Sequence, residues 1–167
     1  PAPAVLNTLT AGPDDVLVVW GAGAVGLSAV MGARIAGCRA IIAVDPIAER
    51  RSLAIELGAT GAVDSSSETL PAEIMELTGG GATLAVDTTA RGDVISTALT
   101  LLRKCGALAL VGLGALTAEL PRLFTYTMHL VIEANTVGEP DTSCTSVHTR
   151  TLRPAMRSAW PIGGFRS

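Results

Sequence analysis

The sequence lacks the features of a protein that lies in a membrane or binds nucleic acid. No apolar run of about 18 or more residues is free of charge, because Arg34 and Arg39 interrupt the longest one. The first residues show no basic stretch followed by an apolar one. The formal net charge of -3 is too small to indicate a nucleic-acid partner. We therefore expect a cytoplasmic protein that binds neither membrane nor nucleic acid.

Cysteine and histidine are too sparse to predict a disulfide framework or a metal centre. The three cysteines, Cys38, Cys105 and Cys144, are widely spaced and form no Cys-x-x-Cys pair. Cys144 and His148 are four positions apart, and His129 is the only other histidine. Two soft ligands do not complete the four-ligand set of a structural zinc site. We expect reduced thiols and no metal site in this chain.

The sequence does contain a regular alternation of short β-branched runs with helical segments. With 167 residues, of which 49% are hydrophobic, the chain can bury the core of one domain. Strands are predicted at 16–19, 40–44, 62–63, 83–87 and 107–111, and helices at 24–36, 46–58, 72–77 and 93–102. Strand, helix, strand at this spacing is typical of right-handed parallel crossovers, so we predict an α/β fold with a doubly wound parallel sheet.

The alternation fades after about residue 113. Only a helix over 121–130 and a short strand at 136–137 are indicated there, so a sixth strand and the C-terminal part look incomplete. Residues 1–141 carry 8 basic and 15 acidic side chains, whereas 142–167 carry 4 arginines and no carboxylate. We predict a domain over 1–137 and an irregular tail over 138–167. Such a tail is either divergent and disordered or the product of a shifted reading frame.

A glycine-rich turn lies between the first predicted strand and the first predicted helix. Its spacing is Gly-x-Gly-x-x-Gly, with Gly21, Gly23 and Gly26. In a dinucleotide-binding turn the first glycine allows the tight bend, the second lets the backbone approach a pyrophosphate, and the third lets the helix pack on the strand. Asp45 stands 19 positions beyond Gly26, at the end of the second strand, where a carboxylate accepts the hydroxyls of a ribose.

Each of these motifs has a plainer explanation when it is taken alone. Chance matches to the glycine pattern are common, and Asp-Pro at 45–46 is also an ordinary turn pair. The two motifs together, in this order of strand, turn, helix and strand, favour dinucleotide binding. A carboxylate at Asp45 repels a 2′-phosphate and so favours NAD over NADP, although Arg50 and Arg51 could accommodate that phosphate.

The stretches GAGAVGLSAVMGARIAGCRAIIAVD, ELGAT, TGGGATLAVDTT and GALALVGLGA resemble the coenzyme-binding domain of zinc-dependent medium-chain alcohol dehydrogenases, with the aryl-alcohol branch nearest in appearance. The resemblance covers roughly residues 4–115 and implies the Rossmann dinucleotide-binding fold. It implies NAD contacts from Gly21, Gly23, Ala24, Val25, Gly26, Asp45, Arg50, Thr88, Val111, Gly112 and Leu113, with Thr89 beside them.

The resemblance also implies hydride transfer between a primary or aryl alcohol and NAD, assisted by zinc in the full-length protein. The family's zinc ligands come from a part that this chain does not contain, so we expect no catalytic residues here and no turnover by the chain alone. Relatives associate through the last strand of the sheet, so the intact protein is expected to be a homo-oligomer.

Four other functions compete with this interpretation. A quinone reductase would share the domain, but Asp45 argues against its NADPH. A short-chain dehydrogenase is disfavoured because Leu130 stands four positions after Tyr126, where that family has lysine. A methyltransferase that uses S-adenosylmethionine and a non-catalytic nucleotide-sensing module stay open as alternatives.

Overall fold

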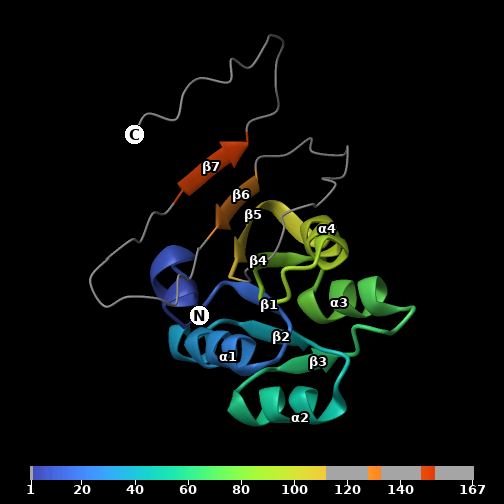
Figure 1. Cartoon of the computed structure of the whole chain (residues 1–167). Coiled ribbons are helices and arrows are strands. Elements are labelled where there is room, and N and C mark those ends of the chain that lie inside the picture. The colour runs from blue at the N-terminus through green and yellow to red at the C-terminus, as the bar shows by residue number, and fades with distance from the viewer. Residues whose placement is uncertain (1, 112–127, 133–147, 153–167) are drawn as a thin grey trace, which may run out of the picture.

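A computed structural model describes residues 2–111, 128–132 and 148–152 of the chain (Figure 1). The strands are β1 (Val16–Trp20), β2 (Ala40–Val44), β3 (Gly61–Val63), β4 (Ala82–Asp87), β5 (Leu102–Leu110), β6 (Met128–Ile132) and β7 (His148–Leu152). The helices are the short π-helix η1 (Ala4–Thr8) and the α-helices α1 (Ala24–Ala36), α2 (Ala48–Leu57), α3 (Leu70–Thr78) and α4 (Gly92–Thr100).

The strands form one sheet in the order β3-β2-β1-β4-β5-β6-β7. The first six strands in this order are parallel to their neighbours, and β7 runs antiparallel to β6. The chain winds from β1 toward β3 in one direction and then returns to place β4 on the other side of β1. This confirms the predicted doubly wound α/β fold. Ligands of such sheets bind at the carboxyl ends of the strands where the winding reverses, which here is the end of β1.

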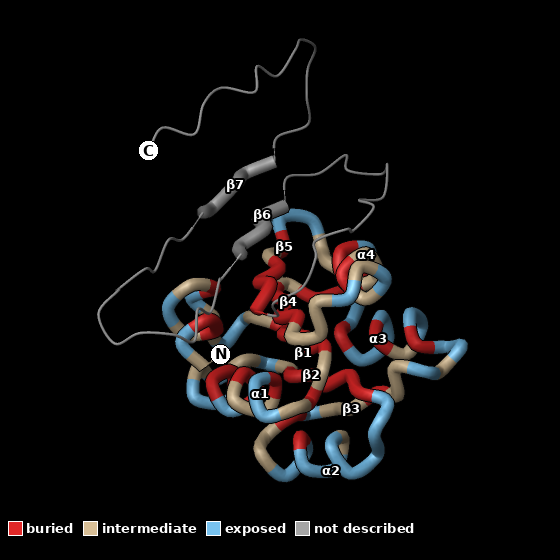
Figure 2. The backbone as a smooth tube through the Cα atoms, viewed as in Figure 1, coloured by how far each residue is buried: buried red, intermediate tan, exposed pale blue. Residues whose placement is uncertain are grey.

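Alternate residues of the central strands enter two separate cores, one on each face of the sheet. Figure 2 shows that the central strands are largely buried. Leu17 and Val19 of β1 pack on the face covered by α1, whereas Val18 and Trp20 pack on the face covered by α3 and α4. All five residues of β1 are buried. Burial on both faces explains why the central strands are continuous apolar runs rather than alternating ones.

Several element boundaries differ from those predicted. Helix α2 begins at Ala48 and not at Pro46, because the N–H of Ile47 donates to the side chain of Asp45 instead of entering the helix. Helix α4 begins at Gly92 and not at Asp93: its N-cap is Arg91, without a side-chain hydrogen bond, and Asp93 lies in the first turn. Strand β5 begins at Leu102, five positions earlier than predicted, with an irregular register opposite β4.

Two predictions for the C-terminal third were wrong. Met128–Ile132 is a strand, although residues 128–130 were assigned to a helix. A short apolar run suits either element, and here backbone pairing with β5 decides between them. The tail over 138–167 was expected to be irregular, yet His148–Leu152 pairs with β6 as β7. Residues 121–127, with Tyr126, and the strand predicted at 136–137 lie outside the described residues.

Among the described residues, no helix combines the length and the apolar character that crossing a membrane requires.

Candidate functional site

The glycine turn joins β1 to α1, and its three glycines differ in their steric surroundings. Gly21 has a positive φ of 89°, and a Cβ there would lie 2.5 Å from Oγ1 of Thr88. A Cβ on Gly26 would lie 1.7 Å from the carbonyl oxygen of Gly21, so the helix can approach the turn only without a side chain. A Cβ on Gly23 would meet nothing within 4 Å. Two glycines are therefore required by the fold, and the third leaves open space.

The open glycine stands at the start of α1. Gly23 is the N-cap of this helix, and no side chain caps it. The first intrahelical bond runs from the N–H of Leu27 to the carbonyl of Gly23, so the amides of Ala24, Val25 and Gly26 have no intrahelical acceptor. Such amides, together with the positive end of the helix dipole, form a site for a phosphate. Ala24 and Val25 are exposed, as access to this site requires.

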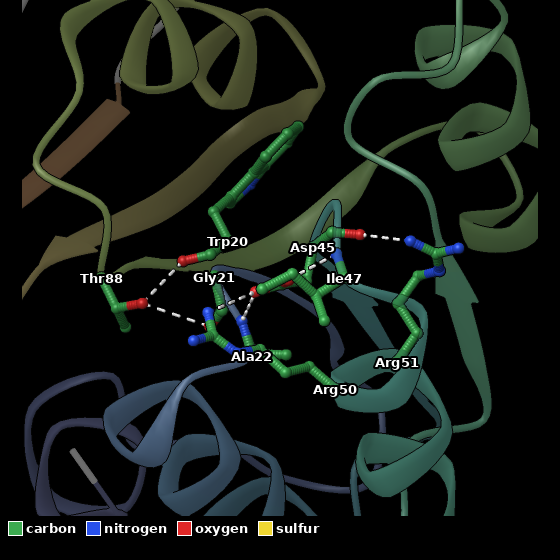
Figure 3. A network of polar contacts seen from close by, with 8 residues as sticks. All are labelled: Trp20, Gly21, Ala22, Asp45, Ile47, Arg50, Arg51 and Thr88. Carbon is green, nitrogen blue, oxygen red and sulfur yellow. Dashed lines mark hydrogen bonds and ion pairs between the residues drawn. The ribbon is translucent and has the colours of Figure 1, made fainter.

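Asp45 follows β2 and fixes the glycine turn through its carboxylate. Its side chain is almost wholly buried, with the residue 2% exposed. Oδ2 accepts the N–H of Ala22 at 2.8 Å, and Oδ1 accepts the N–H of Ile47 at 2.9 Å (Figure 3). A carboxylate has about four acceptor positions, so two remain for other donors. Asp45 thus holds the turn in place and keeps acceptor capacity for a hydroxyl.

Arg50 and Arg51 are neighbours in sequence but have different partners. Arg51 donates to the carbonyl oxygen of Asp45 at 2.8 Å and pairs with Asp64 at 3.0 Å. Hydrogen bonds from Ser66, together with the nearby Arg51, hold the pKa of Asp64 below its ordinary value. The side chain of Arg50 is half-exposed and lies 3.7 Å from Oδ2 of Asp45. Arg51 therefore stabilises the fold through its contacts with Asp45 and Asp64, whereas Arg50 lines the cleft.

A cleft of about 320 Å³ opens between the loops that follow β1, β2 and β4. It is lined by Trp20, Gly21, Gly23, Val44, Asp45, Pro46, Arg50, Ser65, Thr88, Thr89, Arg91 and Val94. Six of these were singled out from the sequence: Gly21, Gly23, Asp45, Arg50, Thr88 and Thr89. The cleft therefore joins the glycine turn to the acid at the end of β2, as a dinucleotide site requires.

The remaining residues predicted as contacts lie beside the cleft or outside the described part of the chain. Ala24, Val25 and Gly26 form the adjoining start of α1. Val111 is buried after β5, where its N–H donates to the carbonyl of Asp87 at 2.8 Å, and it does not line the cleft. Gly112 and Leu113 are outside the described residues. Their proposed contact with NAD stays a prediction.

Sequence reasoning missed six cleft residues: Trp20, Val44, Pro46, Ser65, Arg91 and Val94. The position of Trp20 could have been found, because it directly precedes the first glycine at a strand end. Ser65 and Val94 reach the cleft only through tertiary packing, for which the sequence has no local signal. Arg91 lies beside Asp93, whose hydrogen bonds raise the pKa of the guanidinium, and Nη2 of Arg91 is 2.7 Å from the carboxylate.

Thr88 and Asp87 hold the loop on the β4 side of the cleft. The hydroxyl of Thr88 donates to the carbonyls of Trp20 and Gly21, at 2.9 and 3.2 Å. Asp87 is fully buried, and its carboxylate accepts the N–H and hydroxyl of Thr89 and the N–H of Ala90. Ala90 is held at a positive φ of 55° in this loop. Asp87 and Thr88 therefore stabilise the wall of the cleft on the β4 side.

Within the three described segments, no three His, Cys, Asp or Glu residues lie together where they could hold a metal ion. We assign no metal chemistry to these residues.

Comparison with known proteins gives a consistent result. The profile of the zinc-binding dehydrogenase family matches residues 24–149. The geraniol dehydrogenase of Castellaniella defragrans is 44% identical over 121 residues, which are 72% of this chain and 32% of that protein. The chain therefore spans about a third of the length of this relative.

Two solved structures are similar in fold to most of this chain. An alcohol dehydrogenase zinc-binding domain protein from Burkholderia ambifaria is 42% identical, with a TM-score of 0.68 over 71% of this chain and 32% of that one. The benzyl alcohol dehydrogenase of Acinetobacter calcoaceticus is 39% identical, with a TM-score of 0.68 over 71% of this chain and 33% of that one. The similarity therefore extends over most of the present chain and a minor part of each relative.

Proposed function

The chain belongs to the zinc-binding dehydrogenase family, and from this premise we propose that it forms the NAD-binding part of an alcohol dehydrogenase. The intact enzyme would transfer hydride between a primary or aryl alcohol and NAD. Two relatives are named for geraniol and for benzyl alcohol, which supports this substrate class. The present chain supplies the coenzyme site, and the residues that act on the alcohol belong to the rest of the protein.

The single observation that carries the proposal is the bond between Asp45 and the glycine turn. Oδ2 of Asp45 accepts the N–H of Ala22, so the acid and the turn are held together before any ligand arrives. In a dinucleotide the ribose and the pyrophosphate are only a few bonds apart, and this contact places the groups that would bind them side by side. Pre-organisation of this kind lowers the entropy that the protein must lose when it binds a ligand.

The residues of this chain would bind and orient the coenzyme. The free amides at the start of α1 would donate to the pyrophosphate over Gly23, where no side chain intervenes. Asp45 would accept the hydroxyls of the adenosine ribose with the acceptor positions that Ala22 and Ile47 leave free. When bound, the nicotinamide accepts the hydride that leaves the alcohol carbon.

Discrimination between NAD and NADP would rest on Asp45 and Arg50. A buried carboxylate beside the ribose repels a 2′-phosphate. Arg51 is held by the carbonyl of Asp45 and by Asp64, so it cannot turn to that phosphate without losing both contacts. Arg50 alone is placed to offset the repulsion, and we expect one half-exposed cation to be insufficient. The proposed coenzyme is therefore NAD.

Calorimetric titration of the 167-residue chain with three ligands tests the proposal. We expect NAD to bind at least about tenfold more tightly than NADP, and S-adenosylmethionine to give no measurable heat. Tighter binding of NADP would refute the role given to Asp45. Tighter binding of S-adenosylmethionine would instead support a methyltransferase. Gly23→Val, which fills the open space of the turn, should abolish NAD binding with little change in melting temperature.

Three predictions concern the whole protein and stay predictions. They are its association into a homo-oligomer, its cytoplasmic location and its need for zinc.

A further inference from the structure

One hydroxyl group of the cleft takes no part in holding the fold together. The residues with a hydroxyl that line the cleft are Ser65, Thr88 and Thr89. The hydroxyl of Thr88 donates to the carbonyls that follow β1, and the hydroxyl of Thr89 donates to Asp87. The hydroxyl of Ser65 has no hydrogen-bond partner among the described residues. Of these three hydroxyls, only that of Ser65 is therefore free to bind a ligand.

The serine run that contains Ser65 shows the same contrast. Ser65, Ser66 and Ser67 lie in the loop between β3 and α3. The hydroxyl of Ser66 donates to Asp64, and the hydroxyl of Ser67 donates to Glu73 in the first turn of α3. Neither Ser66 nor Ser67 lines the cleft, whereas Ser65 does. Two hydroxyls of the run thus hold the loop, and the third is left at the cleft.

The hydroxyl oxygen of Ser65 is accessible. In the described segments, the only side-chain nitrogen or oxygen that is both fully buried and without a partner is Nε1 of Trp20. Oγ of Ser65 has no partner there either, so it keeps accessible surface. A serine hydroxyl lies one bond beyond Cβ and can take any of three staggered positions. No described hydrogen bond holds Ser65 in one of them, so its hydroxyl can turn toward a ligand in the cleft.

The place of Ser65 along the sheet indicates which part of a ligand it meets. This step rests on the proposed function, in which the pyrophosphate lies over Gly23 and the ribose at Asp45. β2 lies between β1 and β3, and the N–H of Asp45 donates to the carbonyl of Val63 at the end of β3 (Figure 1). Ser65 follows β3, so it lies beyond Asp45 from the glycine turn. The base is attached to the ribose opposite the phosphate, and therefore extends from Asp45 toward Ser65.

We infer that the hydroxyl of Ser65 donates a hydrogen bond to a ring nitrogen of the adenine base, which makes Ser65 a specificity-determining residue of the coenzyme site. Ring nitrogens N1, N3 and N7 of adenine accept hydrogen bonds, and a serine hydroxyl has one O–H to donate. Pro46 and Val94 line the same cleft with apolar atoms, which suit the flat faces of the base. A base without an acceptor at the edge beside Ser65 would bind more weakly.

The test compares the wild-type chain with Ser65→Ala and with a matched control, Ser66→Ala, in titrations with AMP and with ribose 5-phosphate. Each variant loses one hydroxyl, and in the control the N–H of Ser66 still donates to Asp64. We expect AMP to bind Ser65→Ala about two- to tenfold more weakly, as one hydrogen bond allows, and to bind the control as it binds the wild type. Ribose 5-phosphate should bind all three proteins equally, because it carries no base.

AMP analogues with C–H in place of ring nitrogen N1, N3 or N7 identify the acceptor. One of them should bind the wild-type chain more weakly by the same factor, and Ser65→Ala should not distinguish that analogue from AMP. Such a cycle isolates the single bond from any general change in the loop. Ser65→Ala should also melt no lower than the wild type without ligand, because its hydroxyl has no partner in the described part of the free chain.

The possible failures are distinguishable. Equal AMP affinity for the wild type and Ser65→Ala would overturn the inference and leave the proposed function intact. An equal loss of affinity for AMP and for ribose 5-phosphate would also overturn it, because Ser65 would then contact the ribose and not the base. The same loss in Ser66→Ala would show an effect of the loop and would contradict the role given to Ser65. If neither AMP nor NAD binds the wild-type chain, the proposed function fails and the inference fails with it.

Discussion

The loops after β2 and after β4 lie on either side of the end of β1, and each is held by a buried aspartate. Asp45 is 2% exposed and Asp87 is 0% exposed. Asp45 joins two loops, because it accepts N–H groups from both Ala22 and Ile47. Asp87 closes only its own loop, through Thr89 and Ala90. Only Asp45 lines the cleft.

The difference follows from the strand register. Asp87 is level with Trp20 of β1, whereas Asp45 lies one residue beyond Val44, which is also level with Trp20. Successive side chains in a strand point to opposite faces. Asp87 therefore points to the α4 side, and Asp45 to the side of α1 and the glycine turn. An acid at a strand end indicates a coenzyme site only when its register aims it at the turn.

The largest effect on folding is expected from Asp87→Asn. The amide can accept on one side only, so donors of the Thr89–Ala90 loop lose a charged partner inside the protein. We expect unfolding in urea to show a loss of about 2–3 kcal/mol. NAD affinity should change by less than about threefold. A tenfold loss of affinity at unchanged stability would place Asp87 in the coenzyme site and remove the contrast with Asp45.

The same change at the other acid, Asp45→Asn, should act mainly on binding. We expect NAD affinity to fall by about tenfold or more, because a charged hydrogen bond to the ribose is lost. Stability should fall by only about 1–2 kcal/mol, since one backbone N–H loses its acceptor. Calorimetric titration and urea unfolding of this matched pair measure both quantities. Preference for NAD over NADP should narrow only in the Asp45 variant.

Thr88→Val tests whether the turn is also held from the β4 side. The substitution keeps the branched shape and removes the hydroxyl bonds to the carbonyls of Trp20 and Gly21. The carbonyl of Trp20 still accepts the backbone N–H of Thr88, so the expected loss is about 1 kcal/mol in thermal or urea unfolding. No loss at all would mean that Asp45 alone fixes the turn.

The smallest effects are expected at the two arginines beyond Asp45. Arg51→Gln should cost about 0.5–1 kcal/mol of stability, because Arg51 bonds the carbonyl of Asp45 and pairs with Asp64. Arg50→Gln should leave stability unchanged and weaken NADP binding more than NAD binding. Urea unfolding and paired titrations distinguish the two. If Arg51→Gln instead weakened coenzyme binding and Arg50→Gln lowered stability, Arg51 and not Arg50 would be the residue that contacts the coenzyme.

Much of this site could be predicted because its signals are local. Three glycines at fixed spacing and an acid at a strand end are visible in the sequence, and the apolar central strands identify the doubly wound sheet. The hydrogen bond from the N–H of Ala22 to Asp45 could not be predicted, because an acid that accepts hydrogen bonds only from its own loop has the same position in the sequence pattern. Asp87 is such an acid: it also stands at a strand end, but its partners are Thr89 and Ala90.

The errors lie where long-range pairing decides the structure. β5 starts at Leu102, ahead of the charged Arg103 and Lys104, because Leu102 pairs with Ala82 of β4 before the register shifts. β6 and β7 are likewise defined by their strand partners and not by a local pattern. The predicted division into 1–137 and 138–167 stays a prediction.

Amide chemical-shift mapping of the chain during titration with NAD tests the central claim most directly. The account predicts the largest changes at Gly23, Ala24, Val25 and Asp45, with Ala90 changing little because Asp87 holds it outside the cleft. Changes centred instead at the amino ends of the strands, around Arg39 and Gly79, would contradict the assignment of the glycine turn as the coenzyme site.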